Sequence, residues 1–266
     1  MEQKETVVDH FDRFAEGDRW SKLYDQDADP HGTYNFRVRR DRVEELSAGV
    51  GEGHRVLDIG CGTAIMAPFY LERGCEYHGS DIAEQMVEQA CRRVAHERAS
   101  FSVGDVEAGL DFPDGHFDLV VGLGLLEYLG DVPAAAAEMV RLTRPGGSLI
   151  VSVPQSRCFN HVAKTLLSPL ITNAWAAVKR LRGRATEPHG VYHRRFSAGE
   201  LEGLFARQGC TKTGEAYYNL EVLFYPLHRL LPGLAYRVKQ RAEGLRGTWM
   251  HVFATGYIIR CRRAAE

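Results

Sequence analysis

The chain has 266 residues, of which 44% are hydrophobic and 26% charged, and its formal net charge is −2. These proportions are typical of a globular protein in aqueous solution. The sequence has no apolar run of the roughly 18–20 residues that a membrane-spanning helix needs, and its charged first residues lack the apolar core of a secretory signal.

The cysteines and the charges add two expectations. The six cysteines form no close pair, so neither a zinc knuckle nor a redox Cys-x-x-Cys motif is present, and we expect reduced thiols and a cytoplasmic protein. Residues 1–150 hold 15 Lys and Arg against 28 Asp and Glu, whereas residues 151–266 hold 18 against 7. This asymmetry indicates either an anionic partner for the second half (membrane surface, nucleic acid or acidic substrate) or attraction between the two halves.

In chain order, residues 1–50 read as a helical lead-in, and strands and helices alternate from residue 55 onward. We expect strands at 55–59, 76–80, 99–103, 117–123, 148–153, 210–218 and 250–261, and helices at 64–73, 83–95, 132–143 and 198–208. A Pro-Gly-Gly turn at 145–147 is expected before the fifth strand. Parallel strands need long crossovers, so the alternation predicts an α/β fold, a Rossmann-like, doubly wound, seven-stranded and mostly parallel sheet.

The domain organisation follows from where this alternation stops. We expect a helical N-terminal lid at 1–50 and one domain at 51–266, with helical cap insertions at about 155–190 and 220–246. Ser197 and Glu200 have the spacing of a capping box, which predicts a helix start there. The apolar and basic cap segments leave three readings open: an ordinary cap, a homodimer contact, or peripheral contact with a membrane.

The most informative segment is residues 56–64, VLDIGCGTA. A strand ends in an acid and turns sharply at Gly60 and Gly62, which allow the backbone to pass close to a ligand. Position 65 is Ile, so the third glycine of a nucleotide-dependent dehydrogenase is missing. With Asp81, the Gly104-Asp105-Val106 segment and residues 117–121 and 142–147, the pattern resembles the class I S-adenosylmethionine-dependent methyltransferases of small molecules, over roughly residues 54–154 and more loosely over 193–218.

The resemblance implies a fold and a cofactor, S-adenosyl-L-methionine. Asp58 would attract the ammonium of the methionine tail, the carboxylate of Asp81 would accept bonds from both ribose hydroxyls, and Asp105 would bind the adenine amine. Gly60 and Gly62 would let the ligand lie against the backbone. The rest of the predicted cofactor site is Cys61, Ile82, Met86, Val106 and Leu123.

Acceptor chemistry has two main candidates, His193 as general base and Tyr128 as hydrogen-bonding group, with Glu127 as a third. Each also has a structural reading, as a surface or a packing residue. Tyr128 stands where many quinone-pathway relatives carry His, so we expect no metal. In relatives with a similar lead-in, an aromatic or Arg side chain covers the cofactor tail, which suggests a lid formed by residues 19–24, among them Trp20 and Tyr24, with Tyr34 and Arg37.

We therefore expect an S-adenosylmethionine-dependent methyltransferase that modifies a small organic acceptor. The expected acceptor atom is the hydroxyl oxygen of a hydrophobic secondary metabolite, a quinone-like ring or a lipid-linked compound. N- or C-methylation, a non-catalytic cofactor-binding module and a nicotinamide-linked oxidoreductase remain as alternatives. Nucleic acid is not expected as a partner, because no acceptor motif of such enzymes follows the fourth strand and the aromatic residues lie within apolar stripes.

Overall fold

The computed structural model of the protein describes most of the chain. Within the residues described, no helix is both long enough and apolar enough to cross a lipid bilayer. The described residues are 2–15, 19–24, 33–159, 161–162, 193–223, 231–245 and 247–265.

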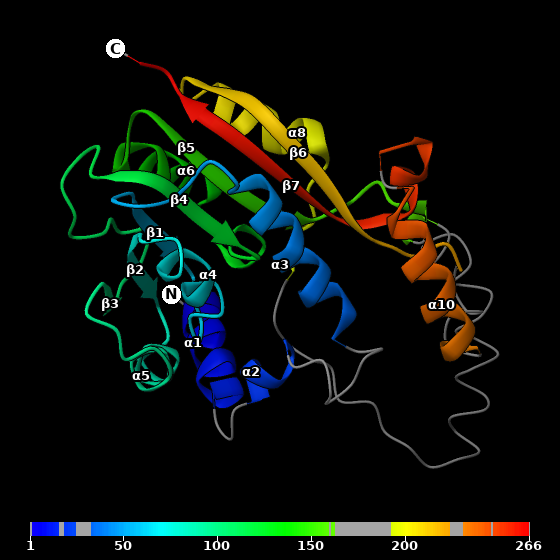
Figure 1. Cartoon of the computed structure of the whole chain (residues 1–266), viewed down its shortest axis with the longest axis horizontal. Helices are drawn as coiled ribbons and strands as arrows, with labels where there is room; N and C mark the ends of the chain where they lie inside the picture. The colour runs from blue at the N-terminus through cyan, green and yellow to red at the C-terminus, as the bar shows by residue number, and fades with distance from the viewer. Residues whose placement is uncertain are drawn as a thin grey trace.

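A seven-stranded sheet forms the centre of the molecule, in the order β3-β2-β1-β4-β5-β7-β6 (Figure 1). Neighbouring strands from β3 to β5 are parallel, and β7 is antiparallel to both β5 and β6. The predicted Rossmann-like, mostly parallel sheet is therefore confirmed. The strands are β1 (Arg55–Ile59), β2 (Glu76–Asp81), β3 (Ala99–Val103), β4 (Phe117–Leu123), β5 (Thr143–Pro154), β6 (Cys210–Leu220) and β7 (Ala254–Arg263).

Helices cover both faces of this sheet, as a doubly wound fold requires. Successive strand residues point to opposite faces, so Val120 packs in one core and Val121 in the other. The first core lies under α6 and α8, and the second lies under α3 and α4 and includes Ala90 of α5. The helices are α3 (Tyr34–Leu46), α4 (Ala67–Leu71), α5 (Glu84–Arg93), α6 (Val132–Leu142) and α8 (Ala198–Ala206).

Two of these helices begin at residues whose side chains satisfy free backbone N–H groups. The carboxylate of Asp131 accepts a hydrogen bond from the backbone N–H of Ala134 at 3.0 Å and starts α6. Ser197 and Glu200 form the reciprocal capping box of α8, as the sequence predicted. Both helices are thereby fixed at the ends that face the strand tips.

Most element ends agree with the sequence prediction to within two residues, and three places differ more. Helix α4 begins at Ala67 rather than at residue 64, because Ala64 has a left-handed φ of 55° that a helix cannot continue. The Pro-Gly-Gly segment lies inside β5, beside a register shift against β4, instead of forming a separate turn. Residues Trp249–Phe253 form the 3₁₀ helix η3, so β7 starts only at Ala254.

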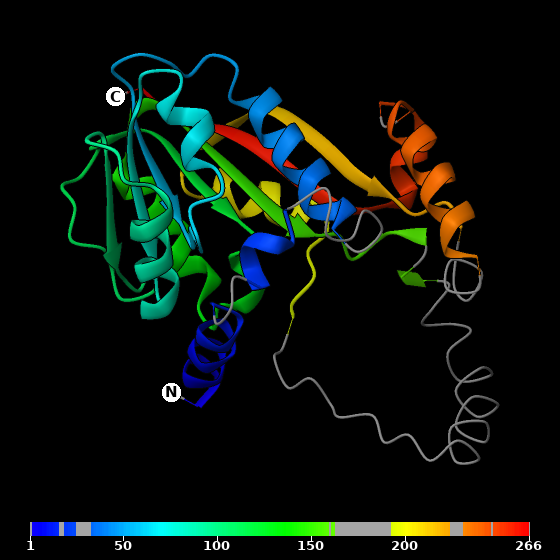
Figure 2. The same ribbon diagram turned by 60° about the horizontal axis from the view of Figure 1, so that its bottom comes forward.

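The N-terminal region forms three helices with two different positions. Helix α1 (Glu2–Ala15) lies beside α5 and below the ends of the first strands, and α2 (Arg19–Lys22) packs against α1 (Figure 2). Helix α3 instead packs on β6, β7 and β5 as part of the layer that covers the sheet. Of the predicted cap segments, α10 (Pro232–Glu243) is helical, whereas residues 163–192 and 224–230 lie outside the described part of the chain.

Candidate cofactor and acceptor site

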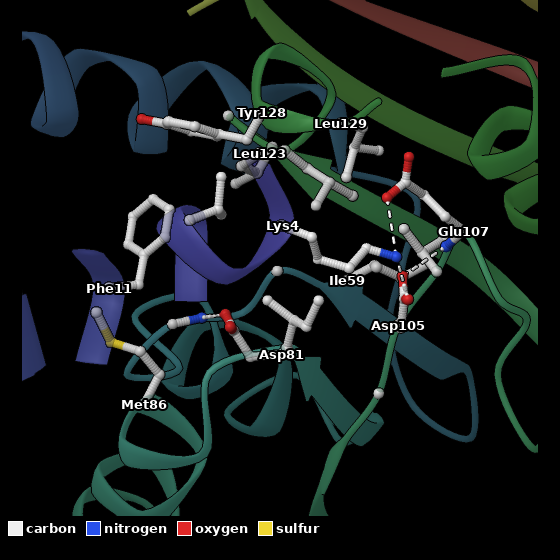
Figure 3. A pocket seen from close by; sticks show the side chains of 18 of the residues that line it. Lys4, Phe11, Ile59, Asp81, Met86, Asp105, Glu107, Leu123, Tyr128 and Leu129 are labelled. Atoms are coloured by element: carbon white, nitrogen blue, oxygen red, sulfur yellow. Dashed lines mark hydrogen bonds and ion pairs between the residues drawn. The ribbon is translucent and has the colours of Figure 1, made fainter. Parts of the chain in front are cut away.

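A cavity of about 460 Å³ opens at the carboxyl ends of β1, β2 and β4 and beside the segment that follows β3 (Figure 3). This is the edge of an open α/β sheet where ligands usually bind. Helices α1 and α2 close the cavity from outside through Lys4, Val7, Phe11 and Trp20. The volume falls in the range of roughly 300–1,000 Å³ that small-molecule sites occupy.

Eight of the ten residues predicted for the cofactor line this cavity: Gly60, Gly62, Asp81, Ile82, Met86, Asp105, Val106 and Leu123. The other two, Asp58 and Cys61, line a smaller hollow next to it, of about 20 Å³, which shares Gly60, Trp20 and Leu123 with the large cavity. The predicted residues thus lie close together, eight around the large cavity and two around the small hollow, which we call the annex.

The glycine loop has the left-handed backbone expected from its sequence, with φ values of 71° at Gly60 and 52° at Gly62. The space above Gly62 is occupied by α2, because a Cβ atom on Gly62 would lie 2.7 Å from Nε1 of Trp20. The close approach that requires glycine here is therefore made by an indole of the chain itself. A ligand that lies against Gly62 would have to displace Trp20.

Asp81 connects the loop to the tip of β2. Its Oδ2 accepts the backbone N–H of Gly62 at 2.8 Å, and its Oδ1 accepts that of Ala83 at 3.0 Å. Burial raises the pKa of Asp81, and these backbone N–H bonds oppose the shift. Each carboxylate oxygen has further lone pairs toward the cavity, so two more hydrogen bonds from neighbouring hydroxyls fit its capacity.

Asp105 lies at the far end of the cavity and is paired with α1. The ammonium of Lys4 bonds Oδ2 of Asp105 and lies 3.2 Å from Oε2 of Glu107 (Figure 3). These pairs raise the pKa of Lys4 above its ordinary value. The carboxylate predicted to bind an adenine amine is thus held by a cation of the lid, which the sequence prediction missed. The apolar spacing of Val7 and Phe11 places Lys4 on the same face of α1, and that periodicity was the available signal.

We predict that Lys4→Met tightens the binding of S-adenosylhomocysteine by about two- to fivefold, the effect of a partly exposed ion pair that a ligand must break. Isothermal titration calorimetry measures the change. Lys212→Met is the matched control, because Lys212 also lies between two carboxylates, Glu202 and Glu215, but on β6. Weaker binding in Lys4→Met would mean that Lys4 helps to hold the ligand.

Asp58 is almost fully buried behind the glycine loop, and the hydroxyl of Tyr77 donates a 2.6 Å hydrogen bond to its Oδ2. Burial raises the pKa of Asp58 to about 7, the Tyr77 bond and Arg39 act in the opposite direction, and the Asp81 carboxylate adds to the rise. The group therefore changes charge near neutral pH. A cation in the annex would stabilise its ionised form.

This titration predicts a pH dependence for ligands with an ammonium tail. Because the carboxylate of Asp58 is ionised only above its raised pKa, S-adenosylhomocysteine should bind about tenfold more tightly at pH 8 than at pH 6. Asp58→Asn should flatten this dependence, and methylthioadenosine, which lacks the tail, should show none in the unchanged protein. An equally steep dependence in Asp58→Asn would remove Asp58 from the tail site.

The wall opposite the carboxylates is apolar and aromatic. Tyr128 of the 3₁₀ helix η2 (Leu126–Tyr128) lines the cavity, and its ring contacts Phe11 edge-on, with centroids 5.1 Å apart. On its other side Tyr128 contacts the ring of His193 at 4.6 Å. His193 itself is exposed and does not line the cavity, and partial burial lowers the pKa of its ring. Of the two predicted catalytic residues, one therefore lies in the cavity and one lies behind it.

A buried polar cluster adjoins the annex. Arg39 of α3 donates a 2.6 Å hydrogen bond to the Tyr24 hydroxyl, and Arg39 and Glu127 lie 2.5 and 3.2 Å from the position that a Cβ on Gly124 would take. Burial raises the pKa of Glu127 to about 7, and its Oε2 is buried without a hydrogen-bond partner among the described residues. The sequence indicated Glu127 as a candidate for the acceptor site but did not indicate Arg39, because α3 contains several arginines and nothing in the sequence distinguishes Arg39 from the others.

Two residues expected in the lid lie elsewhere. Arg37 donates a hydrogen bond to the hydroxyl of Tyr236 at 3.3 Å, and Tyr34 packs edge-on against the Tyr236 ring. Both contact α10 and neither lines the cavity. Trp20 and Tyr24 lie at the site, as expected for lid residues, whereas Tyr34 and Arg37 lie against α10 instead.

Comparisons with known proteins agree with this geometry. Residues 57–151 match the model of the methyltransferase domain family. A Mycolicibacterium smegmatis protein, named Probable S-adenosylmethionine-dependent methyltransferase, is 32% identical over 186 residues, which are 66% of this chain and 68% of that protein. The chain belongs to the class I S-adenosylmethionine-dependent methyltransferase family.

Other relatives of the chain match over shorter spans. A ubiquinone biosynthesis O-methyltransferase of Alkalilimnicola ehrlichii is 32% identical over 148 residues, covering 52% of this chain and 59% of the relative. Several of the curated relatives are matched over only about half of their length. Magnesium protoporphyrin IX methyltransferase of Synechocystis, solved with S-adenosylhomocysteine, superposes with a TM-score of 0.63 at 18% identity, covering 98% of this chain and 100% of that one. This last likeness concerns the fold.

Proposed function

We propose that this methyltransferase transfers a methyl group from S-adenosylmethionine to the hydroxyl oxygen of a small, apolar, ring-containing acceptor. The observation that carries the proposal is the division of one cavity into a wall of carboxylates and glycines and a wall of apolar side chains. The first wall suits a polar nucleoside, and the second suits an uncharged acceptor.

The residues of the first wall fit the cofactor. Asp81 has acceptor capacity for two ribose hydroxyls, Asp105 and the backbone of Val106 lie at the end suited to the adenine, and Asp58 lies in the annex suited to the ammonium. Met86, nearly inaccessible to solvent, and Leu123 supply apolar surface between these polar ends. The bound cofactor would supply a sulfonium methyl group that leaves with neutral thioether formation and bonds to the acceptor oxygen.

Helices α1 and α2 fit the role of a lid. They carry Lys4, Phe11 and Trp20, each of which covers a different part of the cavity. Closure over a loaded site excludes water and aligns the two reactants, and alignment alone contributes roughly 7–11 kcal/mol in well-oriented systems. Helix α3 is excluded from the lid in this proposal, because it packs on the sheet.

The acceptor side is formed by Val7, Phe11, Leu125, Tyr128 and Leu129. Tyr128 carries the only hydroxyl of this set, and its burial holds the pKa well above the ordinary value, so it stays protonated and can donate a hydrogen bond to an acceptor oxygen. His193, neutral at pH 7 because of its lowered pKa, is the proposed final proton acceptor. It lies behind Tyr128, so the proton of the acceptor would pass to the Tyr128 hydroxyl while that hydroxyl releases its own proton toward His193. A hydroxyl acceptor must lose a proton when it is methylated, whereas a tertiary amine that becomes a quaternary ammonium ion has none to lose.

The test uses the full chain with radiolabelled S-adenosylmethionine and a panel of simple phenols, anilines and aliphatic alcohols, with formation of labelled product as the readout. We expect transfer to phenols first. Formation of no product with any hydroxyl compound, while anilines are methylated, would replace O- by N-methylation. Binding of S-adenosylhomocysteine without transfer to any of the three classes would favour a non-catalytic binding module.

The same assay predicts the effects of the acceptor-side residues. His193→Ala should lower the rate of phenol methylation about 100-fold at pH 7, the size expected for loss of general-base catalysis, and should abolish the rise of rate with pH near the His193 pKa. Binding of S-adenosylhomocysteine should stay within about twofold of the unchanged protein, since His193 does not line the cavity. His251→Ala, on η3, is the control.

A further inference from the structure

A second cavity, of about 320 Å³, lies at the opposite edge of the sheet from the cofactor site. It is formed by the residues that precede β1, by the first residues of β4 and β5, and by the end of the antiparallel strand β7. The lining includes His54 before β1, Asp118 of β4, and Arg144 and Ser148 of β5. The strand β7 contributes Arg260 and Arg262. The methyl-transfer site does not use any of these residues.

Three arginines converge on this cavity because of the strand register. Arg260 and Arg262 are two residues apart in β7, so they share a face of the sheet, and Ser148 of β5 is the direct partner of Arg262. Arg144 comes from the start of β5. The single acid of the lining is Asp118, which is paired with Arg144, and its pKa is lowered despite its partial burial. The lining therefore has an excess of positive charge at neutral pH.

Each guanidinium makes at least one hydrogen bond within the protein, while part of its donor capacity is not used there. The side chains of Arg144 and Arg262 are exposed. Arg144 uses Nε toward Asp118, Arg262 uses Nε toward the Gly146 carbonyl at 3.0 Å, and Arg260 donates from Nη1 to Leu46 and from Nη2 to Ser148. The Nη groups of Arg144 and Arg262 have no hydrogen-bond partner in the described chain. Nε of Arg260 is buried and also lacks a partner there.

The unused Nη donors of Arg144 and Arg262 match the oxygens of a phosphate, which accepts several charge-assisted hydrogen bonds at once. The cavity is larger than a bare ion requires and lies in the size range of small-molecule sites. We propose that this cavity binds the phosphate group of a small phosphorylated molecule. The site also gives a role to part of the positive charge concentrated in residues 151–266.

Calorimetric titration of the full chain tests this site with three probes: inorganic phosphate, ribose 5-phosphate and ribose. A titration with sodium chloride at the same ionic strength is the reference for each probe. We expect saturable binding of both phosphates, no binding of ribose, and weaker binding at high salt. Arg262→Gln and Arg144→Gln should each weaken ribose 5-phosphate about tenfold, the loss expected for a charge-assisted hydrogen bond to an oxyanion.

Arg93→Gln is the matched control, because Arg93 is an exposed arginine on α5 that is remote from this cavity. Unchanged binding of S-adenosylhomocysteine in Arg262→Gln shows that the variant is folded. Equal weakening by Arg93→Gln, or phosphate heats no larger than those of chloride, would overturn the proposal. Binding of inorganic phosphate without ribose 5-phosphate would overturn the proposed class of ligand and leave a site for the free ion.

Discussion

Replacing Asp81 by Ala is expected to weaken the binding of S-adenosylhomocysteine at least 100-fold. Two hydroxyls that bond one ionised carboxylate contribute about 1.5–3 kcal/mol each, and about 1.4 kcal/mol corresponds to a factor of ten in affinity. The same carboxylate also accepts the backbone N–H groups of Gly62 and Ala83. Its removal therefore takes away the hydrogen bonds that hold the glycine loop as well as the contacts with the ligand.

Calorimetry on Asp81→Ala, Asp81→Asn and Asp111→Asn separates these two effects. Asn keeps one acceptor oxygen and should retain the loop, so its loss of affinity should lie between those of Ala and the unchanged protein. Asp111 is exposed and outside the cavity, and Asp111→Asn should bind normally. A dissociation constant in Asp81→Ala within threefold of the unchanged protein would contradict the proposed ribose contact.

The order and type of the strands were predictable because local patterns determine them. Short strand-forming runs such as Arg55–Ile59 are separated by segments long enough for parallel crossovers, most of them helical, and the observed bounds of β1, β3 and β4 match the prediction. The errors lie where tertiary contacts override local preference. Ala64 accepts a left-handed φ inside a fully buried loop, which no propensity of alanine would indicate.

The gathering of the three carboxylates was predictable for the same reason, since the ends of parallel strands meet at one edge and carry Asp58, Asp81 and Asp105 there. The missing parts come from segments distant in sequence. Lys4 reaches Asp105 across 101 positions, and Trp20 lies against Gly62. Such contacts depend on how α1 and α2 dock, and an apolar stripe on a helix indicates that it docks but not where.

The buried cluster behind the strand tips carries the second large prediction. Arg39→Met should lower the free energy of unfolding by about 3–5 kcal/mol at pH 8, because removal of one buried charge leaves the other without compensation. Arg39 is nearly inaccessible, and its positive charge lowers the pKa of Glu127, which burial otherwise raises. Without Arg39, the ionised form of Glu127 would keep only the smaller electrostatic contribution of Arg195, an exposed residue.

The sign of the pH dependence distinguishes this mechanism from simple loss of packing. An acid whose pKa is raised to about 7 in the folded protein adds stability at low pH, and this contribution is lost as the pH rises through that value. The loss caused by Arg39→Met should therefore be larger at pH 8 than at pH 5.5, as measured by urea unfolding at both values. A packing defect alone would give equal losses.

Two further variants complete the test of the charge mechanism. Arg39→Met with Glu127→Gln should recover much of the stability at pH 8 and remove the pH dependence, since no charge is left buried. Arg40→Met is the neighbouring control: Arg40 is 30% exposed, pairs with Glu44 at 3.5 Å, and should cost less than about 1 kcal/mol. If the double variant is as unstable at pH 8 as Arg39→Met alone, Arg39 stabilises the fold through Tyr24 and Phe36, which it also contacts, rather than through the Glu127 charge.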